Sequence, residues 1–167
     1  MAIMKILQYP DERLHLVASR VDAFDEGLKT TVADMLETMY AAPGIGLAAT
    51  QVGIQKQIIV IDISENRDDP IVLVNPEIVS KNGKSTLEEG CLSVPGIYET
   101  VDRAENIEVR AVDENGRDFE IRAHGLLSVC IQHEIDHLKG RVFIEYLSRL
   151  KQTRILAKMK KLARERM

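Results

Sequence analysis

The chain has 167 residues, a net charge of −4 and 45% hydrophobic residues. These values fit one globular domain, and they exclude a disordered chain and a broadly basic, DNA-binding protein. Its two cysteines, Cys91 and Cys130, are too few for a disulfide-stapled secreted scaffold. The apolar run at the N-terminus is too short and too interrupted for a signal peptide or a membrane span. We therefore expect a cytoplasmic protein with neither membrane nor DNA partners.

The first half of the chain contains one predicted helix and two predicted strands. Apolar residues at helical spacing predict a helix over residues 25–42, and Pro43 ends it. A segment rich in Gly and Ala follows. β-branched runs then predict strands over residues 57–63 and 70–79. Pro76 predicts that the second strand is either an edge strand or broken at this position.

The second half of the chain changes from strand to helix. Alternating apolar residues around an Asn-Gly pair predict a hairpin over residues 105–123. A helical pattern runs from Gly125 to a stop at Gly140, and a last helix starts near Ser148. Because few parallel β–α–β units are visible, we expect an α+β fold with antiparallel sheets around one central helix.

The central helix carries an H-E-x-x-H motif within the stretch CIQHEIDHLKG, residues 130–140. His133 and His137 are four residues apart and therefore lie on the same helix face, where both can bind one metal ion. Glu134, beside the first histidine, is then placed to act as a base. A catalytic site of this kind usually has three protein ligands and one open position.

Three residues elsewhere in the chain are candidates for the third ligand. His15 and His124 are possible, but their surroundings give no support. The surroundings of Cys91 give more support. It lies in EEGCLSVPG, with a glycine before it and, after it, a Pro-Gly pair that is predicted to form a turn. A thiolate suits zinc or ferrous iron. The spacing alone leaves the choice open.

Three sequence blocks resemble those of the compact bacterial peptide deformylases. The chain reads GIGLAATQ at 44–51, EGCLS at 89–93 and QHEIDH at 132–137. The resemblance implies a metal-dependent hydrolase whose ligands are Cys91, His133 and His137. It favours Fe²⁺ as the metal, with Zn²⁺, Ni²⁺ or Co²⁺ also able to occupy the site.

The resemblance also implies a reaction and a set of site residues. The reaction is hydrolytic removal of the formyl group from the N-terminal formyl-methionine of nascent polypeptides, which releases formate. Metal-activated water would attack, Glu134 would be the general base, and the amide of Gln51 and the backbone N–H of Leu92 would stabilise the oxyanion. Asp136 is expected to hydrogen-bond a histidine or a nearby basic group. The expected substrate-binding residues are Gly44, Ile45, Gly46, Leu126, Val129 and Cys130.

The C-terminal segment carries eight basic residues and one acidic residue over 149–167, although the chain as a whole is acidic. We expect one domain, with residues 1–147 forming the catalytic part and residues 148–167 a basic helix. That helix is either a solvated amphipathic helix or a docking element for RNA, and the resemblance implies the ribosome. The expected inward stripe is Leu150, Ile155, Leu156, Met159 and Leu162, and the expected outward cations are Lys151, Arg154, Lys158, Lys161 and Arg164.

Two other functions fit parts of this sequence. A small zinc metalloprotease also uses H-E-x-x-H, but a cysteine ligand and the absence of a further protease motif argue against it. A non-catalytic RNA-binding domain with a structural metal would instead have a closed site with four protein ligands.

Overall fold

The computed structural model describes residues 2–165 and places three α-helices and seven β-strands in that range. The helices are α1 (Glu26–Ala41), α2 (Gly125–Leu138) and α3 (Arg149–Glu165). The strands are β1 (Gly46–Ala48), β2 (Ile58–Ile61), β3 (Ile71–Asn82), β4 (Ser85–Cys91), β5 (Val94–Arg103), β6 (Asn106–Val112) and β7 (Asp118–His124). None of the described helices is both long and apolar enough to cross a membrane.

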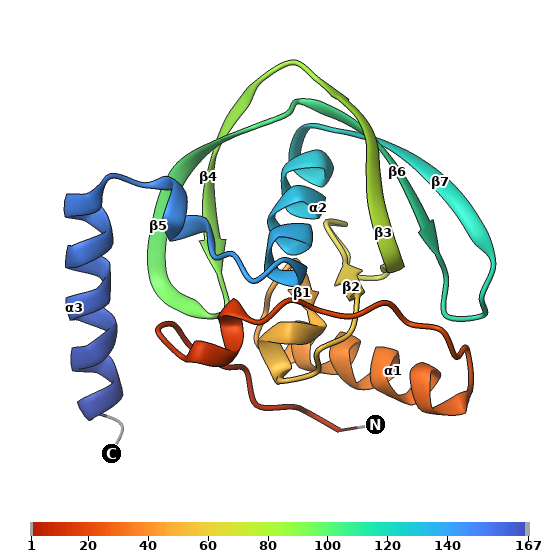
Figure 1. The fold of residues 1–167 in the computed structure, drawn as a ribbon, viewed down its shortest axis with the longest axis horizontal. Coiled ribbons are helices and arrows are strands. Elements are labelled where there is room, and N and C mark those ends of the chain that lie inside the picture. Colours follow the sequence, from red (N-terminus) through yellow and green to blue (C-terminus); the bar gives the residue numbers. More distant parts are fainter. Residues whose placement is uncertain (1, 166–167) are drawn as a thin grey trace.

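The strands form two antiparallel sheets around α2 (Figure 1). One sheet has five strands in the order β1-β2-β3-β6-β7, and the other is the β4-β5 hairpin. Helix α2 contacts both sheets. From Ser128 to Leu138 every residue of α2 is buried, so polar motif residues must find their partners inside the protein. The predicted α+β class with a central helix is confirmed.

Helix α1 packs against the first two strands of the larger sheet. Its N-cap is Asp25, whose side chain accepts a hydrogen bond from Leu28 N at 3.0 Å. The apolar face buries Val32, Met35 and Met39 against these strands, as the helical spacing predicts. The helix therefore fixes the position of the Gly- and Ala-rich segment that follows it.

The structure decides between the alternatives for Pro76 and corrects the turn predicted at Pro95-Gly96. Strand β3 lies between β2 and β6, so Pro76 is not at a sheet edge. It lies instead at a register shift between Val74 and Glu77, which is the predicted break. The pair Pro95-Gly96 is likewise not a turn, because it lies inside β5. The hairpin turns at residues 92–93, directly after Cys91.

Helix α3 lies at the side of the molecule (Figure 1). Ile155 and Met159 are buried in a cluster with Phe143 and with residues of the β4-β5 hairpin. The five cations predicted to face outward are all exposed. The predicted inward position of Leu150 is wrong, since its side chain is 60% exposed. Residues 166–167, which the sequence assigns to this helix, lie outside the described residues.

Candidate metal and catalytic site

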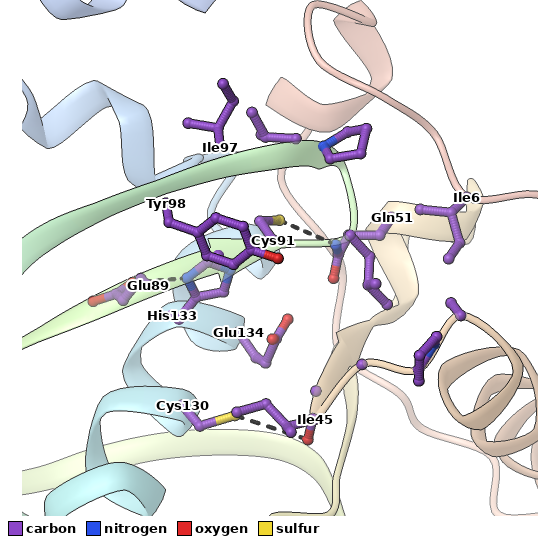
Figure 2. Close-up of a pocket in the computed structure, with 18 of the residues that line it drawn as sticks. Ile6, Ile45, Gln51, Glu89, Cys91, Ile97, Tyr98, Cys130, His133 and Glu134 are labelled. Carbon is purple, nitrogen blue, oxygen red and sulfur yellow. Dashed lines mark hydrogen bonds and ion pairs between the residues drawn. The ribbon is translucent and has the colours of Figure 1, made fainter.

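A cavity of about 540 Å³ opens between α2, β1 and the β4-β5 hairpin. Figure 2 shows side chains from these elements converging on it. The cavity brings together almost all of the site residues predicted from sequence. Those lining it are Gly44, Ile45, Gly46, Gln51, Cys91, Leu92, Leu126, Val129, Cys130, His133 and Glu134. His137 lies next to them, fully buried.

Cys91, His133 and His137 form a compact cluster of potential metal ligands. One ligand atom from each lies within 4.8 Å of the others, and Cys91 Sγ is 3.3 Å from His137 Nε2. Burial lowers the pKa of His137 well below its usual value, so its ring is neutral, as a metal ligand requires. One sulfur and two nitrogens make a donor set that fits a divalent transition metal and leaves a fourth position for water.

The Nδ1 side of the His133 ring contacts a buried chain of ion pairs. Its Nδ1 lies 2.9 Å from Glu89 Oε1, and Arg103 donates to Glu89 through Nε and Nη2, both at 2.9 Å. Arg103 Nη1 also donates to Asp136 Oδ2 at 2.6 Å, and Tyr146 donates to the same oxygen at 2.7 Å. The partner of Asp136 is therefore a basic group and not a histidine.

Glu134 is buried beside the cluster and points into the cavity (Figure 2). Its Oε1 has no hydrogen-bond partner among the described residues. Burial raises the pKa of Glu134 to about 7, because the charged carboxylate loses its hydration. A carboxylate in this state can exchange a proton with a water or an amine near neutral pH.

Gln51 orients its amide toward the same cluster. Its Oε1 accepts a hydrogen bond from Ala48 N at 2.9 Å, which fixes which end of the amide faces the cavity. Its Nε2 donates to Ser93 Oγ at 3.0 Å and lies 3.5 Å from Cys91 Sγ. The side chain thus presents a neutral donor at the cluster, where negative charge can be stabilised.

The apolar part of the cavity adjoins these polar groups. Val129 and Cys130 are buried in its wall, whereas Ile45 and Leu126 are 41% and 46% exposed at its mouth. Burial raises the pKa of the Cys130 thiol well above its usual value, so this thiol stays protonated and behaves as an apolar group. It does not belong to the cluster of potential ligands.

Comparison with known proteins assigns the chain to a family. The sequence model described as polypeptide deformylase matches residues 3–153. Peptide deformylase 2 of Nitrosomonas europaea is 60% identical over 164 residues, covering 98% of this chain and 89% of the relative. The chain belongs to the peptide deformylase family. The peptide deformylase of Chromobacterium violaceum is 57% identical over 167 residues, which is the full length of both proteins.

Solved peptide deformylases have the same fold. The crystal structure of the Legionella pneumophila peptide deformylase matches with a TM-score of 0.94 and 52% identity, covering 99% of this chain and 98% of that one. That of Ehrlichia chaffeensis in complex with actinonin matches with a TM-score of 0.93 and 42% identity, over 96% and 98%. The chain is therefore an enzyme, a peptide deformylase of the metal-dependent hydrolase class, and the alternatives of a protease and of a non-catalytic RNA-binding domain are set aside.

Three deformylase residues with evident structural roles carried no assigned role in the sequence interpretation. Glu89 lies inside the EGCLS block, and its position two residues before Cys91 is the only signal that it belongs to the site. Ser93 lies in the same block and bonds Gln51. Arg103 gives no local signal, because it meets Glu89 only through the pairing of β4 with β5.

Proposed function

We propose that the enzyme removes the formyl group from the N-terminal formyl-methionine of nascent polypeptides by attack of water, with Glu134 as general base. Family membership supports deformylation of nascent peptides. The observation that carries the mechanism is the buried, unpartnered Glu134 carboxylate beside the Cys91, His133 and His137 cluster. Cys91, His133 and His137 would hold a divalent ion, with Fe²⁺ favoured over Zn²⁺, Ni²⁺ or Co²⁺, and such an ion would supply the Lewis acidity that lowers the pKa of water toward neutrality.

Different residues transfer the proton and stabilise the oxyanion. Glu134 accepts a proton from the attacking water and later delivers it to the departing amine, which its pKa of about 7 permits. The carbonyl oxygen of the formyl group gains negative charge in this step. The Nε2 amide of Gln51 and the backbone N–H of Leu92, both at the cavity, donate hydrogen bonds to it.

The peptide main chain pairs with the open edge of β1. Among the described residues, this strand is the first in its sheet and pairs with β2 alone. Asp62 N donates to Ile45 O at 2.8 Å, which makes these two residues a hydrogen-bonded pair. In an antiparallel ladder the next pair, Gly46 and Ile61, is then non-hydrogen-bonded, and its N–H and C=O groups point outward. Gly46 therefore presents its main chain to the cavity.

The edge available to the peptide is short. Ala48 N, the next outward-pointing amide of β1, is already bonded to Gln51 Oε1. A peptide held through the main chain of Gly46, beside Gly44 and Ile45, is recognised by its backbone and not by its sequence. The methionine side chain occupies the apolar wall formed by Leu126, Val129 and Cys130.

The test of this proposal is formate release from formyl-Met-Ala-Ser by metal-replete enzyme. Glu134→Gln keeps the shape of the side chain but cannot act as base, so we expect at least ~100-fold slower release. Metal content, measured on the same samples, should equal that of the wild type. Formate release within a few-fold of wild type by the metal-replete variant would remove Glu134 from the mechanism.

We also propose that α3 docks the enzyme on the ribosome, which places it in the cytoplasm where its substrate emerges. The support is a row of exposed cations, Lys151, Arg154, Lys158, Lys161 and Arg164, on a helix whose inner face is buried. Such cations bind RNA phosphates, and the binding weakens as salt rises. The charge reversals Lys158→Glu and Lys161→Glu should reduce co-sedimentation with ribosomes and leave hydrolysis of a short peptide unchanged. Equal co-sedimentation of the folded variant would contradict docking through α3.

A further inference from the structure

The connection between β2 and β3 reaches across to the segment that precedes β1. Arg67 in this connection donates through Nη2 to Gly44 O and, at 2.8 Å, through Nη1 to Asp62 O. Asp62 N in turn donates to Ile45 O at 2.8 Å. The carbonyls of Gly44 and Ile45, in the proposed peptide-binding segment, therefore both accept hydrogen bonds from the β2–β3 connection.

That connection is itself anchored to the protein interior. The carboxylate of Asp62 is fully buried and accepts hydrogen bonds from Tyr40 Oη at 2.5 Å and from Ser64 N at 2.9 Å. The guanidinium carbon of Arg67 lies 5.1 Å from the centroid of the Tyr40 ring, a cation–π contact. Tyr40 belongs to α1, so the guanidinium is held between a packed helix and the Gly44 carbonyl.

The backbone of Arg67 supports a specific role. Its φ is 58°, in the left-handed region that is uncommon for a side chain of this size. Such a conformation persists where surrounding contacts determine it. Here those contacts are the two hydrogen bonds and the ring contact that aim the guanidinium at Gly44.

We propose that Arg67 is a positioning residue, which sets the backbone of residues 44–46 so that Gly46 meets the peptide main chain. This inference rests on the proposed pairing of substrate with β1. Without the guanidinium, the Gly44 carbonyl loses its donor and the segment, which contains two glycines, gains freedom. The cost then falls on substrate binding, because neither the metal ligands nor Glu134 touches Arg67.

The experiment compares two substrates. Formyl-Met-Ala-Ser has a peptide main chain. Decarboxylated formyl-methionine keeps the formamide and the methionine side chain but lacks the main-chain carbonyl. In Arg67→Ala we expect KM for the peptide to rise about tenfold with kcat little changed, as for loss of a charge-assisted hydrogen bond. KM and kcat of this variant for the decarboxylated compound should stay near those of the wild type.

Two further variants sharpen the comparison. Arg67→Lys, which can still reach one carbonyl, should recover part of the loss. Arg110→Ala removes an exposed arginine that forms a salt bridge with Glu120 and does not line the cavity, so KM and kcat should stay unchanged for both substrates. Thermal unfolding of all variants shows whether each is folded.

The outcomes separate this inference from the one on which it rests. A wild-type enzyme with no preference for the peptide over the decarboxylated compound would show that main-chain pairing is wrong. If the wild type does prefer the peptide, an Arg67→Ala variant with the same preference for the peptide over the decarboxylated compound would overturn the positioning role. An equal loss on both substrates would also overturn it, because the damage would then be general.

Discussion

The Nδ1 nitrogen of His133 lies 2.9 Å from Glu89 Oε1, so a carboxylate on β4 fixes the orientation of a ring on α2. As a metal ligand, His133 would donate its Nδ1 proton to this carboxylate and bind the ion through Nε2. In Glu89→Gln we expect metal affinity to fall about 10–100-fold, the range for loss of such a partner. A zinc titration against a competing chelator measures this, with Glu120→Gln, a surface substitution, as the control. Unaltered affinity would show that Glu89 does not orient the ligand.

Gly46→Ala should impair catalysis more than Gly44→Ala. A Cβ on Gly46 would lie 2.6 Å from Glu134 Oε2 and 3.0 Å from Cys130 Sγ, so the carboxylate that we propose as the general base would have to move. A Cβ on Gly44 would lie 2.6 Å from Leu92 Cδ1 and 3.0 Å from Leu92 Cγ, but this side chain has no proposed part in the reaction and can shift. We expect kcat to fall about 100-fold in the first variant, as when a base is misplaced, and far less in the second. Comparable kcat values in the two variants would count against this geometry.

Met159→Ala should destabilise the fold, although α3 lies at the side of the molecule. Met159 is fully buried, and truncating such a side chain usually costs about 2–5 kcal/mol. Leu150→Ala is the matched control, since that side chain is 60% exposed and should change stability by less than about 0.5 kcal/mol. Urea unfolding measures both. Removal of the whole helix after Ser148 would expose this cluster, so surface charge reversals are the sharper test of docking.

Asp62 should make the fold sensitive to acid. Burial alone would raise its pKa, but hydrogen bonds from Ser64 and Tyr40 outweigh burial and lower the pKa from 3.8 to about 2. A group with a lowered folded-state pKa contributes stability above its unfolded-state pKa and loses it as the pH falls through the folded-state value. Wild type should therefore exceed Asp62→Asn in unfolding free energy above about pH 4, and the difference should shrink toward pH 2. A difference that does not vary over this range would contradict the shift.

Much of the fold could be predicted from local pattern. The helix ending at Pro43, the hairpin over 105–123 and the helix carrying His133 and His137 all follow from periodicity and turn residues. The grouping of Cys91 with these histidines came from the resemblance, because sequence spacing does not say which distant loop reaches a helix. The structure brings the three side chains together.

The remainder depends on contacts between distant segments. Leu150 fits the helical stripe, yet it is exposed and does not join the cluster in which Ile155 and Met159 are buried. The partners of Arg103 and Arg67 are set by strand pairing and by a left-handed backbone, neither of which has a periodic signal. Sequence pattern identifies the residues that gather in the site. The fold determines which side chains form hydrogen bonds that position them.

The short open edge of β1 also affects how the protein behaves in solution. An exposed strand edge is a template for adding strands from other molecules and therefore promotes aggregation. Here the edge ends at Ala48, whose amide is taken by the Gln51 side chain, and β1 has only three residues. A substrate peptide that pairs at a single position can bind there, whereas a second copy of the protein would find too few free groups to extend the sheet. We therefore expect the Gln51 side chain, which is proposed to stabilise the oxyanion, also to limit strand addition by a second copy of the protein.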